Sequence, residues 1–523
     1  MNLFIKLIIK PLRSLLKLLF NRIFYVALAL VVQLAWLLIA LFRLMEYSRW
    51  VTIGMQAIGF LVVLWIVNKK INPSYKLAWT MLILIFPVFG VSLYLLFGKS
   101  RIGAVMEQHY QNLIDETAEY LEGSELTRKR LNEDDRSMRI QSDYIWQYSR
   151  YPVHENTTAE YFQVGDDMFP VLVHELEQAK HFIFIEYFII NDGVMWQTIL
   201  NILEKKAKEG VDVRLIYDGF GCLTTLPYKY DQEMRRRGIK CEVFNRFRPI
   251  LNIIQNNRDH RKICVIDGWT GFTGGINLAD EYINQRKRFG HWKDTAIALR
   301  GDAVRSLTLM FLQMWDVSSV HFTPEVYSKY LDVSQPAHEK EAGYVIPYGD
   351  SPLDRNLVGE MVYMDIINRA NRYVHIMTPY LIIDNEMITA LTYAARRGVE
   401  VQLILPHVPD KEIAFSLAHT YYRRLLENGV QIYEYEPGFV HAKVFVSDDC
   451  KATVGTINLD YRSLYHHFEC GTYLYASPEV PKIEQDFHQT LAKCVRADAE
   501  LLKNDPFMRK LIGPGMRIIA PLL

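Results

Sequence analysis

The sequence predicts an α/β protein in which two duplicated halves form one pseudo-dimeric catalytic unit, preceded by an N-terminal helical membrane segment. Three observations predict it. Strand-like apolar runs alternate with amphipathic helical runs, and this order occurs twice along the chain. A five-residue motif recurs with identical spacing in both copies. The first 101 residues are apolar and basic, whereas the remainder is acidic.

The N-terminal segment, residues 1–101, contains apolar stretches close in length to the ~20 residues that a membrane-spanning helix needs. These stretches are residues 23–45, 51–67 and 77–97. Residues 1–22 place basic residues at helical spacing among leucines and isoleucines, which predicts an interfacial helix; a secretory signal peptide is the alternative, although no clear cleavage site follows. The last stretch contains Pro87 and Gly90 and fits a re-entrant hairpin as well as a third span.

Charge is divided unevenly along the chain. Residues 1–101 hold 12 Lys or Arg and one acid, a net charge of +11, so the remaining residues carry −11. A basic membrane-proximal segment suits anionic lipid, and the positive-inside rule places the catalytic portion in the cytoplasm. So acidic a catalytic portion is a poor partner for nucleic acid. The six cysteines form no C-x-x-C pair, which argues against a zinc cage or a disulfide framework.

Beyond the N-terminal segment, we expect a helical connector at residues 102–150 and two α/β halves at residues 151–335 and 336–523. The first copy of the repeat reads as a strand at 181–190, a helix at 196–208 and a strand at 211–217. The second copy reads as 373–383, 387–397 and 399–405 in the same order. Such alternation predicts mixed, mostly parallel sheets with helices on both faces.

Each copy ends in an H-x-K-x4-D motif followed by a glycine and an asparagine. The residues are His260, Lys262, Asp267, Gly274 and Asn277 in the first copy and His441, Lys443, Asp448, Gly455 and Asn458 in the second. The offsets from each histidine are 2, 7, 14 and 17 in both copies. A single His-x-Lys pair is often only an exposed strand face, on which residues two apart point the same way. The duplicated set instead predicts one active site.

At these motifs the chain resembles the phospholipase D superfamily, and within it the bacterial cardiolipin synthases. The narrower resemblance rests on further segments: "NRDHRKICVIDGWTGFTGGINLADEY" (257–282), "HWKDT" (291–295), "TPYLIID" (378–384), "NLDYRSLYHHFE" (458–469) and "KLAWTMLILIFPVFGVSLYLLFGKSR" (76–101). Together with the motifs they extend over nearly the whole chain. The resemblance implies a multi-pass protein of the bacterial cell membrane.

The resemblance also implies a reaction. One histidine would form a covalent phosphatidyl-histidine from phosphatidylglycerol, and the other would protonate the leaving glycerol and then activate a second phosphatidylglycerol to give cardiolipin. Precedent in the family favours His260 as nucleophile and His441 as acid and base, although the symmetry of the motifs leaves this open. No cofactor and no metal are expected.

The remaining motif residues are assigned by the same resemblance. Lys262, Lys443, Asn277 and Asn458 would hold phosphate oxygens. Asp267 and Asp448 would complete the catalytic motifs, as supports rather than reacting groups. Asp294 and Glu469 resemble the acids that orient the catalytic histidines. Arg258, Arg261 and Arg462 flank the motifs and could meet a lipid headgroup, although arginines beside a strand end are common; His467, next to His466, is expected to be structural.

Three alternatives remain. Water, serine or another alcohol could replace the second phosphatidylglycerol, which would make the chain a phospholipase D or a phosphatidylserine-type synthase. A nuclease would use the same motifs, although the acidic catalytic portion argues against it. A non-catalytic scaffold should have lost a motif residue, and both motifs are intact. A homo-oligomer is possible.

Overall fold

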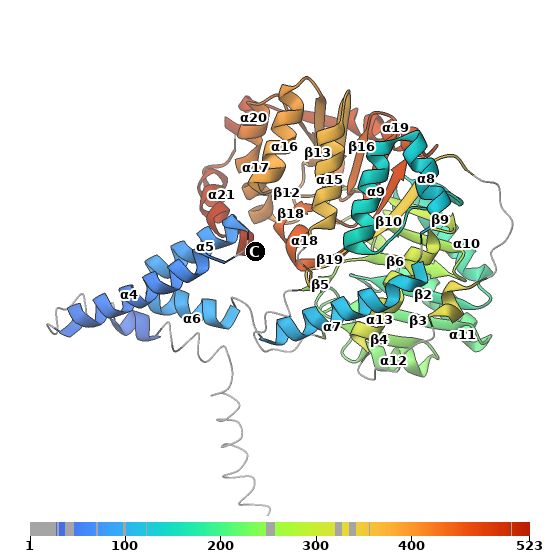
Figure 1. The fold of residues 1–523 in the computed structure, drawn as a ribbon, viewed down its shortest axis with the longest axis horizontal. Coiled ribbons are helices and arrows are strands. Elements are labelled where there is room, and N and C mark those ends of the chain that lie inside the picture. The colour runs from blue at the N-terminus through green and yellow to red at the C-terminus, as the bar shows by residue number, and fades with distance from the viewer. Residues whose placement is uncertain are drawn as a thin grey trace, which may run out of the picture. The chain divides into compact units, whose positions relative to one another are not determined.

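The computed structural model describes residues 28, 31–36, 47–69, 72–97, 101–121, 123–246, 257–319, 327–333, 341–354, 356–503 and 505–522 (Figure 1). The predicted interfacial helix, and most of the first apolar stretch, lie outside these residues. The chain forms two compact units. The first contains residues 1–107, 247–256 and 518–523, and the second contains residues 108–246 and 257–517.

The N-terminal unit contains helices α4 (Tyr47–Val67), α5 (Pro73–Ile85) and α6 (Pro87–Phe97). The side chain of Asn72 accepts a hydrogen bond from the amide of Ser74 at the start of α5, where proline is well tolerated. Helix α5 ends just before Pro87, which lacks the amide proton that a continuous helix would need. A Cβ on Gly90 would lie 2.6 Å from Ile83 Cα, so α5 and α6 pack closely. The third apolar stretch is therefore a helical hairpin and not one helix.

The membrane prediction is not confirmed by these helices. Within the described ranges, no helix meets the combined length and apolarity required to cross a bilayer. Many large apolar side chains of α4 to α6 are nevertheless exposed, among them Trp50, Phe60, Leu61, Leu84, Ile85 and Leu95.

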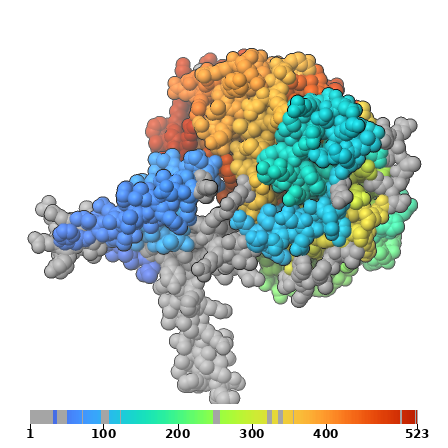
Figure 2. Space-filling model, in the orientation of Figure 1, coloured from blue at the N-terminus to red at the C-terminus, as the bar shows by residue number. Residues whose placement is uncertain are grey.

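The connector is helical, as predicted, and consists mainly of α7 (Arg101–Thr117), α8 (Glu125–Asp134) and α9 (Arg136–Ser149). Helices α8 and α9 pack on the second half of the repeat, although the first half follows them in sequence. The Tyr344 hydroxyl donates to Asp134 at 2.7 Å, and the Ser149 hydroxyl donates to the Gly349 carbonyl at 2.7 Å. Figure 2 shows these two helices covering part of the surface near α15 (Val358–Arg369).

The first half is built on a seven-stranded sheet in the order β1-β9-β7-β6-β2-β3-β4. The strands are β1 (Thr157–Phe162), β2 (Phe182–Tyr187), β3 (Asp212–Asp218), β4 (Lys240–Phe244), β6 (Lys262–Ile266), β7 (Thr270–Gly274) and β9 (Ala296–Gly301). Helices lie on both faces. Ile183 and Ile185 of β2 join the core formed with α10 (Gly165–Gln178) and α11 (Val194–Lys208), whereas Phe184 stacks at 4.5 Å on Phe311 of α13 (Val304–Ser318).

The second half repeats this plan in the order β10-β19-β17-β16-β11-β13-β14-β20. The strands are β10 (Tyr344–Asp350), β11 (Tyr373–Met377), β13 (Glu400–Pro406), β14 (Gln431–Tyr435), β16 (Val444–Ser447), β17 (Lys451–Gly455), β19 (His467–Tyr475) and β20 (Cys494–Ala497). Tyr363 of α15 stacks on Phe445 at 3.9 Å, and Phe487 of α19 (Val480–Leu491) stacks on His375 at 4.4 Å. Helices α16 (Asn385–Arg396) and α17 (Glu412–Leu426) complete the half.

The sheets are mixed, as predicted, but they are not mostly parallel. Along the two strand orders, β2-β3-β4 and β11-β13-β14 pair in parallel and every other pairing is antiparallel. The parallel strands are those joined through helices. Strands β6 and β7, like β16 and β17, are joined by short turns, and a short turn permits only antiparallel pairing.

The two halves lie against each other within the second compact unit. Strands β7 and β9 contact β17 and β19, and the Thr273 hydroxyl lies 3.4 Å from Cys470 Sγ across this contact. The motifs are carried on β6 and β16, which are the next strands inward from β7 and β17 in their sheets.

Candidate active site

Two very short strands cross from one half to the other immediately before the motif histidines. Strand β5 (Arg258–Asp259) pairs in parallel with the start of β19, and strand β15 (Gly438–Val440) pairs in parallel with β8 (His291–Lys293). The next amide in each case continues the pairing. His260 N donates to the Phe468 carbonyl at 2.9 Å, and His441 N donates to the Lys293 carbonyl at 2.7 Å. Each histidine is thus anchored on the opposite half.

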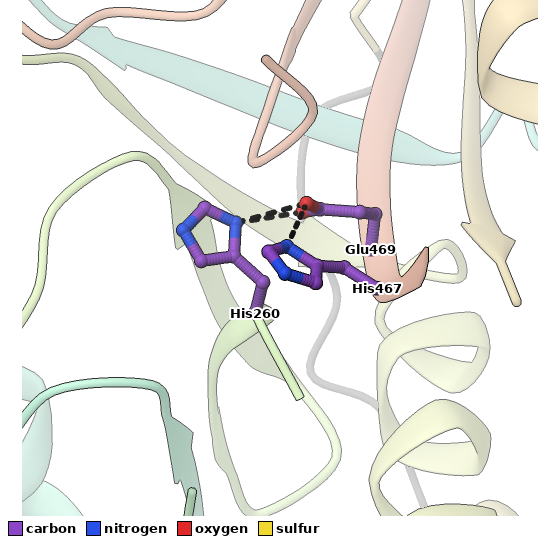
Figure 3. A group of neighbouring side chains, drawn as sticks. All are labelled: His260, His467 and Glu469. Atoms are coloured by element: carbon purple, nitrogen blue, oxygen red, sulfur yellow. Dashed lines mark hydrogen bonds and ion pairs between the residues drawn. The ribbon is translucent and has the colours of Figure 1, made fainter. Parts of the chain in front are cut away.

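The residue after each accepting carbonyl is one of the two predicted orienting acids. His260 Nδ1 lies 2.9 Å and 3.0 Å from the two oxygens of Glu469, as Figure 3 shows. His441 Nδ1 lies 2.6 Å from Asp294 Oδ2. The acid that follows the first motif in sequence therefore pairs with the histidine of the second motif, and the reverse holds for the other acid. This crosswise arrangement joins both motifs in a single site.

The lysines lie beside the histidines, although not in the predicted way. The sequence predicts that His260 and Lys262 share one strand face, but His260 precedes β6, and both His441 and Lys443 precede β16. The extended link allows the side chains to fold back onto the histidines. Lys262 Nζ donates to the His260 carbonyl at 2.5 Å, and Lys443 Nζ donates to the His441 carbonyl and lies 2.7 Å from His441 Nδ1.

Burial lowers the pKa of both imidazoles. It lowers the pKa of His260 well below its ordinary value, and the positive charges of Lys262 and Lys443 lower this pKa further. Burial and Lys443 together lower the pKa of His441 to about 4, against the opposing effect of Asp294. A neutral imidazole, with Nδ1–H held by a carboxylate, presents Nε2 as a nucleophile or base.

The lysines are close to losing their charge near neutral pH. Burial lowers the pKa of Lys262 to about 8, although Glu469 and Asp294 act to raise it. Burial lowers the pKa of Lys443 to about 7, with a further contribution from the positive charge of Lys262. A phosphodiester anion placed among these groups would stabilise their charged forms.

Both motif asparagines are buried. Asn277 Oδ1 accepts from the Ile189 amide at 3.0 Å, and its Nδ2 donates to the Tyr282 hydroxyl at 2.7 Å. Asn458 Oδ1 has no hydrogen-bond partner among the described residues. Gly275 leaves room for the neighbouring acid, because a Cβ there would meet Asp294 Oδ1 at 2.0 Å. The assignment of both asparagines to phosphate binding stays a prediction.

The motif aspartates do not join the histidines and lysines. Asp267 and Asp448 follow the far ends of β6 and β16, with positive φ angles of 53° and 54°. The Asp267 carboxylate accepts from the amides of residues 180–182 at 2.7 to 2.9 Å, and Asp448 accepts from residues 371–373 at 2.8 to 3.1 Å. Both therefore hold the start of a neighbouring strand. These contacts agree with the interpretation of Asp267 and Asp448 as supports, and their place among the catalytic residues stays a prediction.

Arg261, one of the three arginines that flank the motifs, does not lie where a lipid headgroup could meet it. Arg261 is 2% exposed and lies 2.7 Å from Glu186 and 3.4 Å from Asp259, inside the protein. It neutralises buried carboxylates and does not face a headgroup. The sequence could have predicted this, because neighbouring side chains in an extended segment point to opposite sides and Arg261 directly follows His260.

Several neighbours of the histidines were not assigned to the site from sequence. The rings of Tyr282, Trp292 and Phe439 surround His441, with centroids 5.6 to 5.9 Å away. The side chains of Phe188 and His467 flank His260 at 4.9 Å and 5.3 Å. Ser463 donates to Glu469 at 2.7 Å and Thr456 donates to its other oxygen. Tyr282, Trp292 and His467 reach the histidine of the opposite half only when the halves assemble, whereas Phe188 and Phe439 belong to the same half as the histidine that each contacts.

Two groups of side chains have the composition of a metal site. Among the described residues, His260, His467 and Glu469 form one cluster whose ligand atoms lie within 4.8 Å of one another, and His375, Glu484 and His488 form another. In the first cluster Glu469 is already engaged by hydroxyl and imidazole donors, and lysine ammonium groups lie nearby. That environment fits an anion better than a divalent cation. The expectation of metal-free, cofactor-free chemistry stays a prediction.

Two α/β halves that each contribute a histidine and a lysine to one centre define the phospholipase D-like class of proteins. A family model described as "Cardiolipin synthase, PLD-like domain" matches residues 172–315 and 363–491, and one described as "Phospholipase_D-nuclease N-terminal" matches residues 57–99. A solved phosphatidylserine synthase from Haemophilus influenzae shares the fold, with a TM-score of 0.57 at 15% identity over 74% of this chain and 100% of that chain.

Curated relatives narrow the family. An uncharacterised protein of Streptococcus mutans is 47% identical over 88% of this chain and 99% of its own length. A cardiolipin synthase of Halalkalibacterium halodurans is 33% identical over 91% of this chain and 94% of its own length, and cardiolipin synthase 2 of Bacillus anthracis is 34% identical over 89% and 90%. The chain belongs to the cardiolipin synthase family.

Proposed function

We propose that this protein is a cardiolipin synthase, which transfers a phosphatidyl group from one phosphatidylglycerol to another and releases glycerol. The observation that carries the proposal is the crosswise pairing of His260 with Glu469 and of His441 with Asp294. It supplies two oriented imidazoles in one buried centre, and a two-step displacement at phosphorus needs a nucleophile and a separate acid–base group.

In the first step, His260 Nε2 attacks the phosphorus of phosphatidylglycerol. The bound phosphodiester anion favours the imidazolium form of His441. The P–N bond forms and the P–O bond to the head glycerol breaks, and the departing oxygen takes a proton from this imidazolium, which becomes neutral. Lys262 and Lys443, with Asn277 and Asn458, stabilise the charge on the phosphate oxygens. Glu469 holds His260 in the tautomer whose Nε2 lone pair is free.

In the second step, a primary hydroxyl of another phosphatidylglycerol loses its proton to His441 and attacks the same phosphorus. The P–O bond of cardiolipin forms, the P–N bond breaks, and the electron pair returns to His260. Asp294 stabilises the imidazolium form of His441, which donates the proton in the first step and forms again in the second. Bonds broken and formed are alike, so the exchange needs no nucleotide.

We propose further that residues 1–101 attach the enzyme to the bacterial cell membrane, with the catalytic halves at residues 151–335 and 336–523 on the cytoplasmic face. Exposed apolar side chains on α4 to α6 support attachment. Lys69 also donates to Tyr94 at 2.9 Å and lies 3.6 Å from the Trp65 ring centroid, a combination typical of the bilayer interface. Anionic lipid is the partner that the basic segment would favour.

The decisive experiment is incubation of purified full-length protein with phosphatidylglycerol alone, followed by lipid mass spectrometry. We expect cardiolipin and free glycerol in equal amounts, and neither product from His260→Ala or His441→Ala. Phosphatidic acid as the only phospholipid product would replace the proposal by a hydrolase. Phosphatidylserine formed on addition of serine, in place of cardiolipin, would indicate the serine-using alternative.

A further inference from the structure

The face of the site beside His260 contains polar groups that the proposed reaction does not use. Arg258 and His260 are two residues apart in an extended segment and point to the same side, as do His467 and Glu469 on β19. Arg258 and His467 are directly opposed partners in the pairing of β5 with β19, which brings their side chains together. Figure 3 shows His467 beside His260, both pointing toward Glu469.

Arg258 is a buried cation that forms no ion pair with a carboxylate within the part of the chain that the structure describes. Its side chain is 6% exposed, and its guanidinium lies 4.1 Å from the Phe220 ring centroid. Its Nε has no hydrogen-bond partner among the described residues. Its Nη1 donates to the Asn257 carbonyl over a long distance, 3.4 Å. Asp218 is the closest source of negative charge, but its oxygens accept amides from residues 220, 221 and 259 at 2.7 to 3.0 Å.

His467 is unsatisfied in the same way. It is 7% exposed, and within the described part of the chain neither of its ring nitrogens has a hydrogen-bond partner. Its Nδ1 lies 3.4 Å from Glu469 Oε1, and this oxygen already interacts with Ser463 and His260. A buried imidazole and a buried guanidinium that both lack acceptors are costly unless a ligand supplies them.

Arg462 adds a second positive charge to this face. It lies on α18 (Tyr461–His466), which leads directly into His467, and its side chain is partly exposed. After burial, its positive charge is one of the causes that lower the pKa of both Arg258 and His467, so Arg462 interacts electrostatically with both side chains. A buried guanidinium and a buried imidazole that have nitrogens without a partner among the described residues, with a second guanidinium acting on both, have the chemistry of a phosphate site.

We propose that Arg258, Arg462 and His467 form a second anion subsite, which binds the phosphodiester of the acceptor phosphatidylglycerol. The inference rests on the proposed function, because only an acceptor that carries its own phosphate needs a second subsite. The first phosphate is bound by Lys262 and Lys443 while it is transferred. The second stays intact, and its attachment to the arginines orients the terminal hydroxyl toward the phosphatidyl-histidine.

The test compares an anionic and a neutral acceptor with phosphatidylglycerol in mixed micelles as donor. The acceptors are labelled glycerophosphoglycerol, the deacylated headgroup, and labelled glycerol. We expect Arg462→Gln and Arg258→Gln to lower kcat/KM for glycerophosphoglycerol about 10- to 100-fold, the effect of a lost charge-assisted hydrogen bond. Exchange of glycerol should change less than about 3-fold, because a neutral acceptor makes no use of the subsite.

Controls separate the possible outcomes. Arg237→Gln removes an arginine that pairs with Glu233 on the outside of the first half and should change neither rate. Arg462 is partly exposed, so its variant should fold even if Arg258→Gln does not, and Arg462→Lys should recover part of the activity. Inorganic phosphate should compete with glycerophosphoglycerol in the wild type and not in Arg462→Gln. Equal loss with both acceptors would overturn the subsite alone, whereas a wild type that makes no cardiolipin from phosphatidylglycerol would overturn the proposed function and the subsite with it.

Discussion

The two catalytic histidines lie in motifs of identical spacing, but the acids paired with them have different surroundings. Glu469 receives Ser463 and Thr456 in addition to His260, so its negative charge is divided among several donors. Among the described residues, Asp294 accepts from His441 at 2.6 Å and otherwise only from the amide of the next residue, Thr295, at 2.9 Å. The position equivalent to Thr456 is Gly275, which brings only backbone toward Asp294.

This difference separates the two roles. An acid–base histidine must become positively charged during the cycle, and an undivided carboxylate stabilises that charge better than a shared one. The aromatic rings around His441 would also favour a cation. A nucleophilic histidine must be neutral before it attacks, but burial lowers the pKa of both His260 and His441, so their pKa values do not distinguish the two roles. The asymmetry therefore supports His260 as nucleophile and His441 as acid and base.

The largest effect would test this division directly. Replacement of either histidine by alanine should reduce turnover by about 10⁴-fold or more. In His441→Ala the phosphatidyl adduct should still form slowly on His260 and then persist, because no base activates the acceptor. Peptide mapping by mass spectrometry after incubation with phosphatidylglycerol would detect it. An adduct on the His441 peptide of His260→Ala would reverse the assignment.

The acids should then differ in the step they affect. Asp294→Asn should lower kcat on phosphatidylglycerol about 100- to 1000-fold, because His441 becomes a poorer acid. A donor with a p-nitrophenol leaving group needs no proton, so release of p-nitrophenol by this variant should approach the wild-type rate. Glu469→Gln should stay slow with both donors, since it affects the nucleophile. Equal recovery of both variants would remove the distinction between the pairs.

Lysine ionisation predicts a smaller, pH-dependent effect. The pKa of Lys443 is about 7 and that of Lys262 about 8, so both carry charge below these values and lose it as the pH rises. We expect kcat/KM to fall by up to about tenfold per pH unit above pH 8, where the free enzyme no longer holds the phosphate oxygens. The measurement is a pH profile from 5 to about 9.5 at constant ionic strength. A profile that stays flat to the alkaline end would contradict the lowered lysine pKa values.

The motif aspartates should have the smallest effect on chemistry. Asp267→Asn and Asp448→Asn remove one amide acceptor each at the start of β2 or β11, so each should cost about 1–3 kcal/mol of unfolding free energy. Turnover of the folded variants should stay within about 3-fold of the wild type, because neither carboxylate approaches the histidines. Chemical denaturation and lipid assays on the same samples would compare the two quantities. A loss of activity as large as that of Asp294→Asn, without loss of stability, would return them to the catalytic set.

Sequence reasoning predicted the duplication, the helices on both faces of each sheet and the paired motifs, because spacing and periodicity are local properties. The orienting acids Asp294 and Glu469 were named only by the resemblance to the family. Sequence reasoning did not predict that Glu469 serves His260 and Asp294 serves His441, since that depends on strands β5 and β15, which are only two and three residues long. It also misjudged the strand directions. Alternating strands and helices resemble parallel units, and nothing in the period distinguishes a hairpin such as β6–β7 from them.

The sequence also could not predict which arginines face the site, because arginine serves both to bind anions and to neutralise buried carboxylates. Arg258 and Arg261 look equivalent in "RDHRK", yet one lies on the side of His260 and the other is enclosed by Glu186 and Asp259. His467 follows another histidine and gave no pattern from which its place beside His260 could be inferred. Which side of a short extended segment faces the site is decided by the packing of the halves.

The exchange of short strands between the halves has a consequence for how this chain can change over generations. Neither half contains a complete histidine–acid pair, so a truncated product with one intact motif would be inert, and two separately made halves would regain activity only by finding each other. A substitution at Glu469 removes the carboxylate that His260 contacts, although the two residues are 209 positions apart in sequence. The two copies therefore cannot drift apart independently, and tolerance of change in one is set by the residues that the other presents to it.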